Sequence, residues 1–151
     1  MAVPLPAGES GSPQPTPGPV GIVLVSHSEA LVHGLRDLLL QIGGSELAVA
    51  VAGGTDEGEL GTSYRRIADA ITSVDRAAGV VVLADLGSAV LTARTVLADR
   101  ADNGPGAHPG IRLVDAPLVE GAVAAAAIAA AGADVDSVCA AAEEARDARK
   151  L

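Results

Sequence analysis

Residues 20–25, Val-Gly-Ile-Val-Leu-Val, form a continuous apolar run in which β-branched side chains dominate. Such a run is typical of a strand that is buried on both faces, as in a parallel sheet. The polar turn Ser26-His27-Ser28 follows it. Leucines and Ile42 then recur at helical spacing over residues 29–42, and Gly43-Gly44 marks the end of that helix. This stretch therefore predicts a strand, a polar turn and a helix.

The same alternation continues along the rest of the chain. Further strands are predicted over Leu47–Ala52, which we expect to be buried, and over Val80–Ala84 and Ile111–Val114. The segments after them predict helices over Tyr64–Arg76, from residue 86 to about Asp99, from Pro117 to about Ala131 and from Asp134 onward. Alternating strands and helices indicate parallel strands joined by helical crossovers. We therefore expect an α/β fold: a doubly wound, mainly parallel four-stranded sheet with helices on both faces.

The length of 151 residues corresponds to one domain. Residues 1–19 are dominated by Pro, Gly and Ser and show no apolar period, which predicts a disordered tail before a single domain over residues 20–151. Hydrophobic residues make up 49% of the chain, yet there is one Tyr and no Phe or Trp. The core must therefore be built from small aliphatic side chains.

Charge, cysteine content and apolar runs exclude several classes of protein. A net charge of −9 argues against a nucleic-acid partner, which would need clustered Lys and Arg. The longest apolar run, Gly121–Ala131, is far shorter than the ~20 residues of a membrane span, and the chain does not begin like a signal peptide. Cys139 is the only cysteine, so an intrachain disulfide is excluded. We expect a cytoplasmic protein without a membrane partner.

Three polar clusters follow three of the predicted strands. They are Ser26-His27-Ser28, Gly53-Gly54-Thr55-Asp56 and Asp85-Leu86-Gly87-Ser88. The carboxyl ends of parallel strands lie at one edge of a sheet, where ligands bind beside the point at which the strand order reverses. This coincidence predicts a functional site at that edge.

His27 is the candidate nucleophile of this site, because a neutral imidazole is a good nucleophile near pH 7. If the first and third strands are neighbours, the Asp85 carboxylate can reach one ring nitrogen, fix the tautomer and orient the other nitrogen for attack. The alternatives are a packing or capping role for His27 and a helix-capping role for Asp85.

Phosphoryl transfer also needs donors that hold charged oxygens. Gly53, Gly54 and Gly87 would let backbone amides come close, the hydroxyls of Thr55 and Ser88 could add donors, and Ser28 stands at a helix start. The glycine-rich loop over residues 53–63 lacks the Lys-Ser or Lys-Thr pair of a Walker A motif, and it could instead be a flexible turn. No dinucleotide fingerprint is present, and the three histidines lack the clustered spacing of a metal site, so we expect no cofactor and no metal.

Four segments, VSHSEALVHGL, AGGTDEGELGTS, VVLADLGSAVLTA and DAPLVEGAVAAA, together carry a family resemblance. They resemble the phosphotransfer subunits of phosphoenolpyruvate-dependent dihydroxyacetone kinases, which belong to the mannose-type EIIA superfamily of the sugar phosphotransferase system. The resemblance covers about residues 20–146. Residues 1–19 lie outside the family core, and the loop before Ile111 is expanded.

The resemblance implies a phosphotransferase with a covalent phosphohistidine intermediate. It implies that His27 is phosphorylated at Nε2, that Asp85 supports it, and that Gly54, Thr55 and Ser88 line the site. It further implies a homodimer that accepts the phosphoryl group from the phosphocarrier HPr. The acceptor would be ADP held on the nucleotide-binding subunit of the kinase, with dihydroxyacetone as the final substrate. Some members carry fused HPr-like and enzyme I-like domains, whereas this chain has only the first domain, so we expect separate donor proteins.

Two other functions remain open at this point. One is a mannose-type EIIA domain that serves sugar transport rather than a kinase. The other is a regulatory binding module for a small molecule, without covalent chemistry. A self-contained kinase is disfavoured because no nucleotide-phosphate motif is present.

Overall fold

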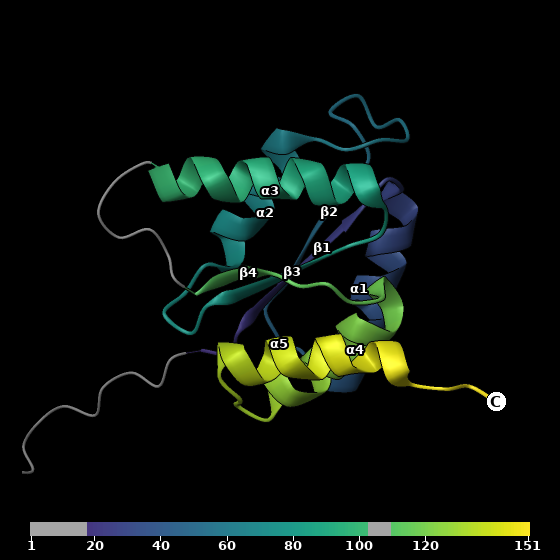
Figure 1. The fold of residues 1–151 in the computed structure, drawn as a ribbon, viewed down its shortest axis with the longest axis vertical. Coiled ribbons are helices and arrows are strands. Elements are labelled where there is room, and N and C mark those ends of the chain that lie inside the picture. The colour runs from purple at the N-terminus through teal and green to yellow at the C-terminus, as the bar shows by residue number, and fades with distance from the viewer. Residues whose placement is uncertain (1–17, 103–109) are drawn as a thin grey trace, which may run out of the picture.

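A computed structural model of the chain describes residues 18–102 and 110–151 (Figure 1). The strands are β1 (Gly21–Ser26), β2 (Val49–Gly53), β3 (Val80–Ala84) and β4 (Ile111–Leu113). The helices are α1 (Glu29–Gly43), α2 (Tyr64–Val74), α3 (Gly87–Asp102), α4 (Leu118–Ala130) and α5 (Val135–Glu144), and a 3-10 turn, η2 (Ala145–Asp147), follows α5.

The sheet is parallel throughout, with the strand order β2-β1-β3-β4. From β1 the chain moves outward to β2 and then returns to the other side of β1 to form β3. The strand order therefore reverses between β1 and β3, and the carboxyl ends of these two strands flank the switch point. The α/β class predicted from the sequence is confirmed.

Each central strand contributes side chains to two separate cores, because successive residues of a strand point to opposite faces. Ile22 and Leu24 of β1 pack with α1, α4 and α5, whereas Val23 and Val25 pack with α2 and α3. Figure 1 shows α2 and α3 on one side of the sheet and α4 and α5 on the other. All six residues of β1 are buried, so the apolar run that predicted a two-faced strand is explained by helices on both faces.

Three helices begin at side-chain caps that satisfy amides of the first turn. Ser28 accepts a hydrogen bond from the Leu31 amide at the start of α1, and Ser63 accepts one from the Arg66 amide at the start of α2. Asp134 caps α5 in the same way, as its position in the sequence predicted. These caps fix where the loops from β1 and β2 enter their helices.

Some predicted boundaries were wrong. The segment Leu47–Ala52 was expected to be a buried strand, but β2 begins at Val49, and its first three residues are only half-buried because it lies at the edge of the described sheet. Pro117 precedes α4 as its N-cap rather than lying in its first turn. The expectation of a disordered tail over residues 1–19 falls outside the described residues, apart from Gly18 and Pro19.

None of the helices in residues 18–102 and 110–151 has the length and apolar character required to cross a bilayer.

Candidate functional site

The site lies at the switch point of the sheet, where β1 and β3 end side by side. The two strands are paired in register from Gly21–Val80 to Val25–Ala84, and the Asp85 amide continues the ladder by donating to the Val25 carbonyl at 3.1 Å. This pairing brings His27 and Asp85 together although they are 58 positions apart in the sequence. The condition on which the predicted contact depended, that the first and third strands are neighbours, is met.

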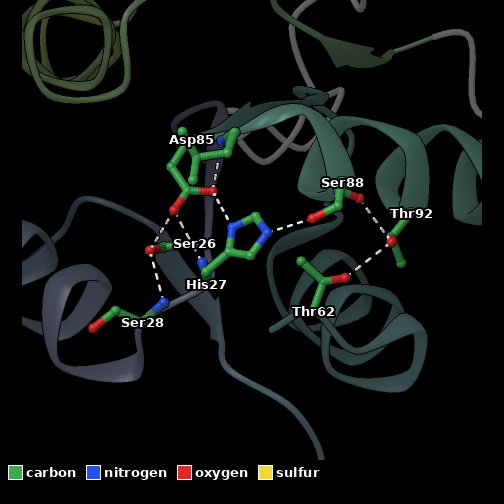
Figure 2. A network of polar contacts seen from close by, with 8 residues as sticks. Ser26, His27, Ser28, Thr62, Asp85, Ser88 and Thr92 are labelled. Carbon is green, nitrogen blue, oxygen red and sulfur yellow. Dashed lines mark hydrogen bonds and ion pairs between the residues drawn. The ribbon is translucent and has the colours of Figure 1, made fainter. Parts of the chain in front are cut away.

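The His27 imidazole lies between the Asp85 carboxylate and the Ser88 hydroxyl (Figure 2). Its Nδ1 is 2.9 Å from Asp85 Oδ1, and its Nε2 is hydrogen-bonded to Ser88 Oγ. A carboxylate accepts hydrogen bonds, so the contact with Asp85 places the proton of a neutral ring on Nδ1. Nε2 then carries the lone pair, and Ser88 donates to it. About a quarter of the His27 side chain (24%) is exposed to solvent.

Four hydrogen bonds converge on the Asp85 carboxylate. Oδ1 accepts from His27 Nδ1 and from the Leu86 amide, and Oδ2 accepts from Ser26 Oγ at 2.8 Å and from the His27 amide at 3.0 Å. Partial burial acts to raise the pKa of Asp85, but hydrogen bonds from the His27 amide, the His27 ring, Ser26 and Leu86 outweigh it and hold the pKa below its ordinary value of 3.8. Asp85 is therefore ionised at neutral pH and orients His27.

Ser26 is fully buried and holds the Asp85 carboxylate in place. Its hydroxyl donates to Asp85 and accepts a hydrogen bond from the Ser28 amide at 3.0 Å. Ser26 belongs to the cluster that predicted the site, but no role was expected for its side chain. The signal that could have revealed it is a hydroxyl at the last position of an otherwise apolar buried strand.

The predicted phosphate-binding residues Gly87 and Ser88 open helix α3 directly beside Nε2. The first amides of a helix have no intrahelical acceptor, and the helix dipole favours negative charge there. Ser88 is also tied to the glycine-rich loop: its carbonyl accepts from Thr92 Oγ1 at 2.9 Å, and Thr92 Oγ1 is 3.1 Å from Thr62 Oγ1 (Figure 2). No role was predicted from the sequence for Thr62 or Thr92.

The backbone amides of three other predicted phosphate-binding residues, Ser28, Gly54 and Thr55, already donate hydrogen bonds within the fold. The Ser28 amide donates to Ser26 Oγ, and the Gly54 amide donates to the Ser26 carbonyl at 3.1 Å. The amide of Thr55 donates to the Glu59 carbonyl, and its hydroxyl accepts from the Glu59 amide. A phosphate-binding role for Ser28, Gly53, Gly54 and Thr55 remains a prediction, and the geometry favours the α3 side.

Arg66, at the start of α2, reaches back toward the end of β2. Its Nη1 donates to the Gly53 carbonyl at 2.8 Å and lies 3.6 Å from Glu29 Oε1. The guanidinium therefore joins the end of β2 to the first turn of α1. No local sequence pattern predicts this contact, because it depends on how α2 packs against β2.

Gly53 is required by close packing rather than by an unusual backbone conformation. A Cβ atom there would lie 2.6 Å from the Glu29 Cα atom, 2.6 Å from Val32 Cγ2 and 2.9 Å from the Ser28 carbonyl oxygen. Two of these neighbours are backbone atoms of the segment that carries His27. The end of β2 can therefore approach α1 only because Gly53 has no side chain.

Replacing Gly53 with alanine is expected to destabilise the fold by about 1–3 kcal/mol, the usual cost of overpacking. Gly34, which is exposed in the middle of α1 and has open space around it, is the matched control. Gly34→Ala is expected to stabilise the protein by about 0.5–1 kcal/mol, because alanine is the better helix former. Urea unfolding of both variants measures the difference, and equal stability of the two would contradict this account of Gly53.

Within residues 18–102 and 110–151, no group of three or more His, Cys, Asp or Glu side chains is arranged to hold a metal ion. His33, six positions after His27, lies 3.8 Å from Glu29 on the exposed surface of α1. It lines the same groove as His27, together with Glu59 and Leu60 of the glycine-rich loop.

Comparison with known proteins gives a consistent family match. Residues 21–139 match the family model EIIA-man, described as the fructose IIA component of the phosphotransferase system. Among curated proteins, the phosphoryl donor subunit DhaM of the PEP-dependent dihydroxyacetone kinase of Escherichia coli (strain K12) is 42% identical over 122 residues, which cover 79% of this chain and 25% of that protein. The DhaM of Providencia stuartii is 37% identical over 134 residues, which cover 87% of this chain and 28% of that protein.

A shorter relative is matched over most of its length. The phosphoryl donor subunit DhaM of PEP-dependent dihydroxyacetone kinase 2 of Listeria innocua is 37% identical over 107 residues, which cover 71% of this chain and 83% of that protein. This chain thus spans about a quarter of the length of the Providencia and Escherichia relatives but most of the Listeria one. Among solved structures, the unknown function protein EF1359 superposes with a TM-score of 0.69 at 35% identity, covering 83% of this chain and 93% of that one.

Proposed function

The chain belongs to the mannose-type EIIA family of the phosphotransferase system, and we propose that it is a phosphohistidine carrier that accepts a phosphoryl group on Nε2 of His27. The family resemblance predicted from four sequence segments is thereby confirmed. One observation carries the proposal: Nδ1 of His27 is hydrogen-bonded to the Asp85 carboxylate, and Nε2 therefore faces Ser88 at the start of α3. An imidazole arranged in this way has a defined nucleophilic nitrogen beside amides that can hold phosphoryl oxygens.

The donor in this proposal is a phosphohistidine protein, HPr, as the family resemblance implies. Nε2 of neutral His27 attacks the phosphorus in line, a new N–P bond forms, and the N–P bond of the donor breaks. The donor imidazole leaves with the bonding electron pair and departs neutral if its other nitrogen is protonated. The His27 ring then bears the positive charge, and its Nδ1–H remains hydrogen-bonded to the ionised Asp85. No proton has to move during the transfer.

The start of α3 is the place we propose for the phosphoryl oxygens. Before the reaction the Ser88 hydroxyl donates to Nε2, and it must turn away to expose the lone pair. After that rotation the same hydroxyl can donate to a phosphoryl oxygen, as can the first amides of α3 at Gly87 and Ser88. Ser28, Gly53, Gly54 and Thr55, at the ends of β1 and β2, would form the opposite wall of the site.

The proposed acceptor is ADP held on the nucleotide-binding subunit of a dihydroxyacetone kinase. The named relatives are phosphoryl donor subunits of such kinases, and this supports the assignment. The proposed enzyme activity is therefore that of a phosphotransferase subunit with dihydroxyacetone as the final substrate. We further propose that the chain acts as a homodimer, as the family resemblance implies.

The test of the proposal is incorporation of phosphate from radiolabelled phosphoenolpyruvate in the presence of enzyme I and HPr. Acid-labile, alkali-stable label on this chain is the expected result. An absence of label, with active donors and a folded protein, would contradict the carrier function and favour the regulatory binding module.

A sugar-transport EIIA domain is the second candidate, because the matching family model is described as a sugar-system component. The purified phosphorylated chain distinguishes the two functions by its discharge. Rapid loss of phosphate to the ADP-loaded kinase subunit, with formation of ATP there, is expected. Loss only to a mannose-type permease subunit would assign the chain to transport instead.

A further inference from the structure

Large apolar side chains gather around His27 although they are exposed to solvent. In residues 18–102 and 110–151, and leaving aside Leu151 at the end of the chain, the three most exposed leucines are Leu60, Leu91 and Leu86, at 80%, 64% and 62%. Exposing an apolar side chain to water is unfavourable, and these three side chains are not compensated by burial in either core of the described fold. Scattered exposed leucines need no explanation, but these three stand on segments that carry the site.

The position of each leucine relative to the site follows from its contacts. Leu60 lines the groove that contains His27. Leu86 follows Asp85 directly, and its amide donates to the Asp85 carboxylate. Leu91 lies one helical turn after Ser88 and therefore on the same side of α3. The loop that bears Leu60 is anchored next to the site, because the Gly61 amide donates to the His27 carbonyl at 3.1 Å.

The loop that carries Leu60 is strongly acidic at its tip. Asp56 lies 3.4 Å from Arg65, so its charge is partly compensated, whereas Glu57 and Glu59 have no ion-pair partner within the described residues. Both glutamates are exposed, and Glu59 lines the same groove as Leu60. On the other side of the site, Arg94 lines the cleft beside Leu86. The face around His27 thus combines apolar side chains with an acidic edge at the loop.

We propose that Leu60, Leu86 and Leu91, with Glu57 and Glu59, form a docking surface for the protein that brings the phosphoryl group to His27. This proposal rests on the proposed function and deepens it. The partner presents apolar side chains around its own phosphohistidine and basic side chains toward the loop tip. Apolar contact at the centre and opposite charges at the rim are the usual anatomy of a transient protein interface.

The docking surface is tested by comparing a protein donor with a small one. Phosphorylated HPr must dock on the chain, whereas phosphoramidate is small enough to reach Nε2 without this surface. Leu60→Ala and Leu91→Ala are each expected to lower the second-order rate of transfer from HPr by about ten-fold, as is usual for truncated interface anchors. Labelling by phosphoramidate should stay at the wild-type rate, since neither leucine belongs to the reacting groups.

Leu38→Ala is the matched control, because Leu38 is also an exposed leucine of a helix but lies in the second half of α1, away from His27. This variant should accept phosphate from HPr at the wild-type rate. Unchanged HPr rates in Leu60→Ala and Leu91→Ala would overturn the docking surface and leave the carrier function intact. A wild-type chain that neither HPr nor phosphoramidate labels would overturn the carrier function and, with it, the docking surface.

The acidic edge is tested separately by the double variant Glu57→Gln/Glu59→Gln. Removing both charges is expected to slow transfer from HPr at low salt and to flatten its dependence on ionic strength, because exposed charges steer association and salt screens them. Labelling by phosphoramidate should again be unaffected. Identical salt dependence in the double variant and the wild type would overturn the assignment of basic side chains to the partner.

Discussion

Replacing His27 with glutamine is expected to abolish phosphorylation of this chain by phosphoenolpyruvate, enzyme I and HPr. Glutamine keeps a polar side chain that can still bond to Asp85, but its amide nitrogen has no available lone pair with which to attack phosphorus. The loss should therefore be complete rather than partial, because no other group on the described part of the site combines a nucleophilic nitrogen with the contacts of His27.

His33 provides the control for this experiment. It is a second histidine of the same groove, it is half exposed (51%), and it pairs with the exposed Glu29 rather than with a partly buried carboxylate such as Asp85. His33→Gln should be labelled as well as the wild type. Phosphorus NMR of the labelled wild-type chain should show the Nε2 isomer of phosphohistidine, because Asp85 occupies Nδ1. Full labelling of His27→Gln, or label on His33, would place the site elsewhere.

The parts of the fold that local sequence specifies were predicted well. A buried apolar run rich in β-branched residues defines β1, and a hydroxyl or carboxylate at each cap defines the start of α1 and α5. The contact between His27 and Asp85 could be predicted only on the condition that the first and third strands are neighbours. Strand order is set by packing across the whole sheet, so the local sequence does not specify it. The partial burial of β2 was missed for the same reason: an edge strand and a central strand can carry similar sequences.

The supporting contacts of the site were the least predictable. The hydrogen bond from Arg66 to the Gly53 carbonyl and the contact between Thr62 and Thr92 join elements far apart in the sequence. Glycines in the loop predicted close backbone approach, which holds for Gly53, but the neighbour is α1 of the same chain. A glycine in the sequence can indicate that another group comes close to the backbone there, without indicating which group it is.

The second large effect is expected for Asp85→Asn, which should slow transfer from HPr by about 10²–10⁴-fold while the fold is retained. Both carboxylate oxygens of Asp85 accept from N–H groups: His27 Nδ1 and the Leu86 amide on Oδ1, and the His27 amide on Oδ2. An asparagine offers one acceptor and one donor, so one side must be mismatched. Whichever way the amide turns, it loses the negative charge that stabilises the phosphorylated, positively charged ring.

The pH dependence of stability separates this electrostatic role from a merely structural one. Because the pKa of Asp85 in the folded protein lies below its ordinary value of 3.8, its ionised form contributes stability that is present above pH 3.8 and is lost as the pH falls through the folded pKa. Asp85→Asn should therefore be less stable than the wild type at neutral pH, and the deficit should shrink as the pH falls below 3.8 and through the lowered pKa of Asp85.

Asp134→Ala is the control for Asp85→Asn, since Asp134 also has a lowered pKa but caps α5, outside the His27 site. It should lower the stability of the fold, as the loss of a helix cap does, and leave the transfer rate unchanged. Rapid-quench transfer rates and urea unfolding at several pH values measure both quantities. If Asp85→Asn transferred phosphate at the wild-type rate, Asp85 would not be the group that orients His27, and the tautomer would have to be set by another contact.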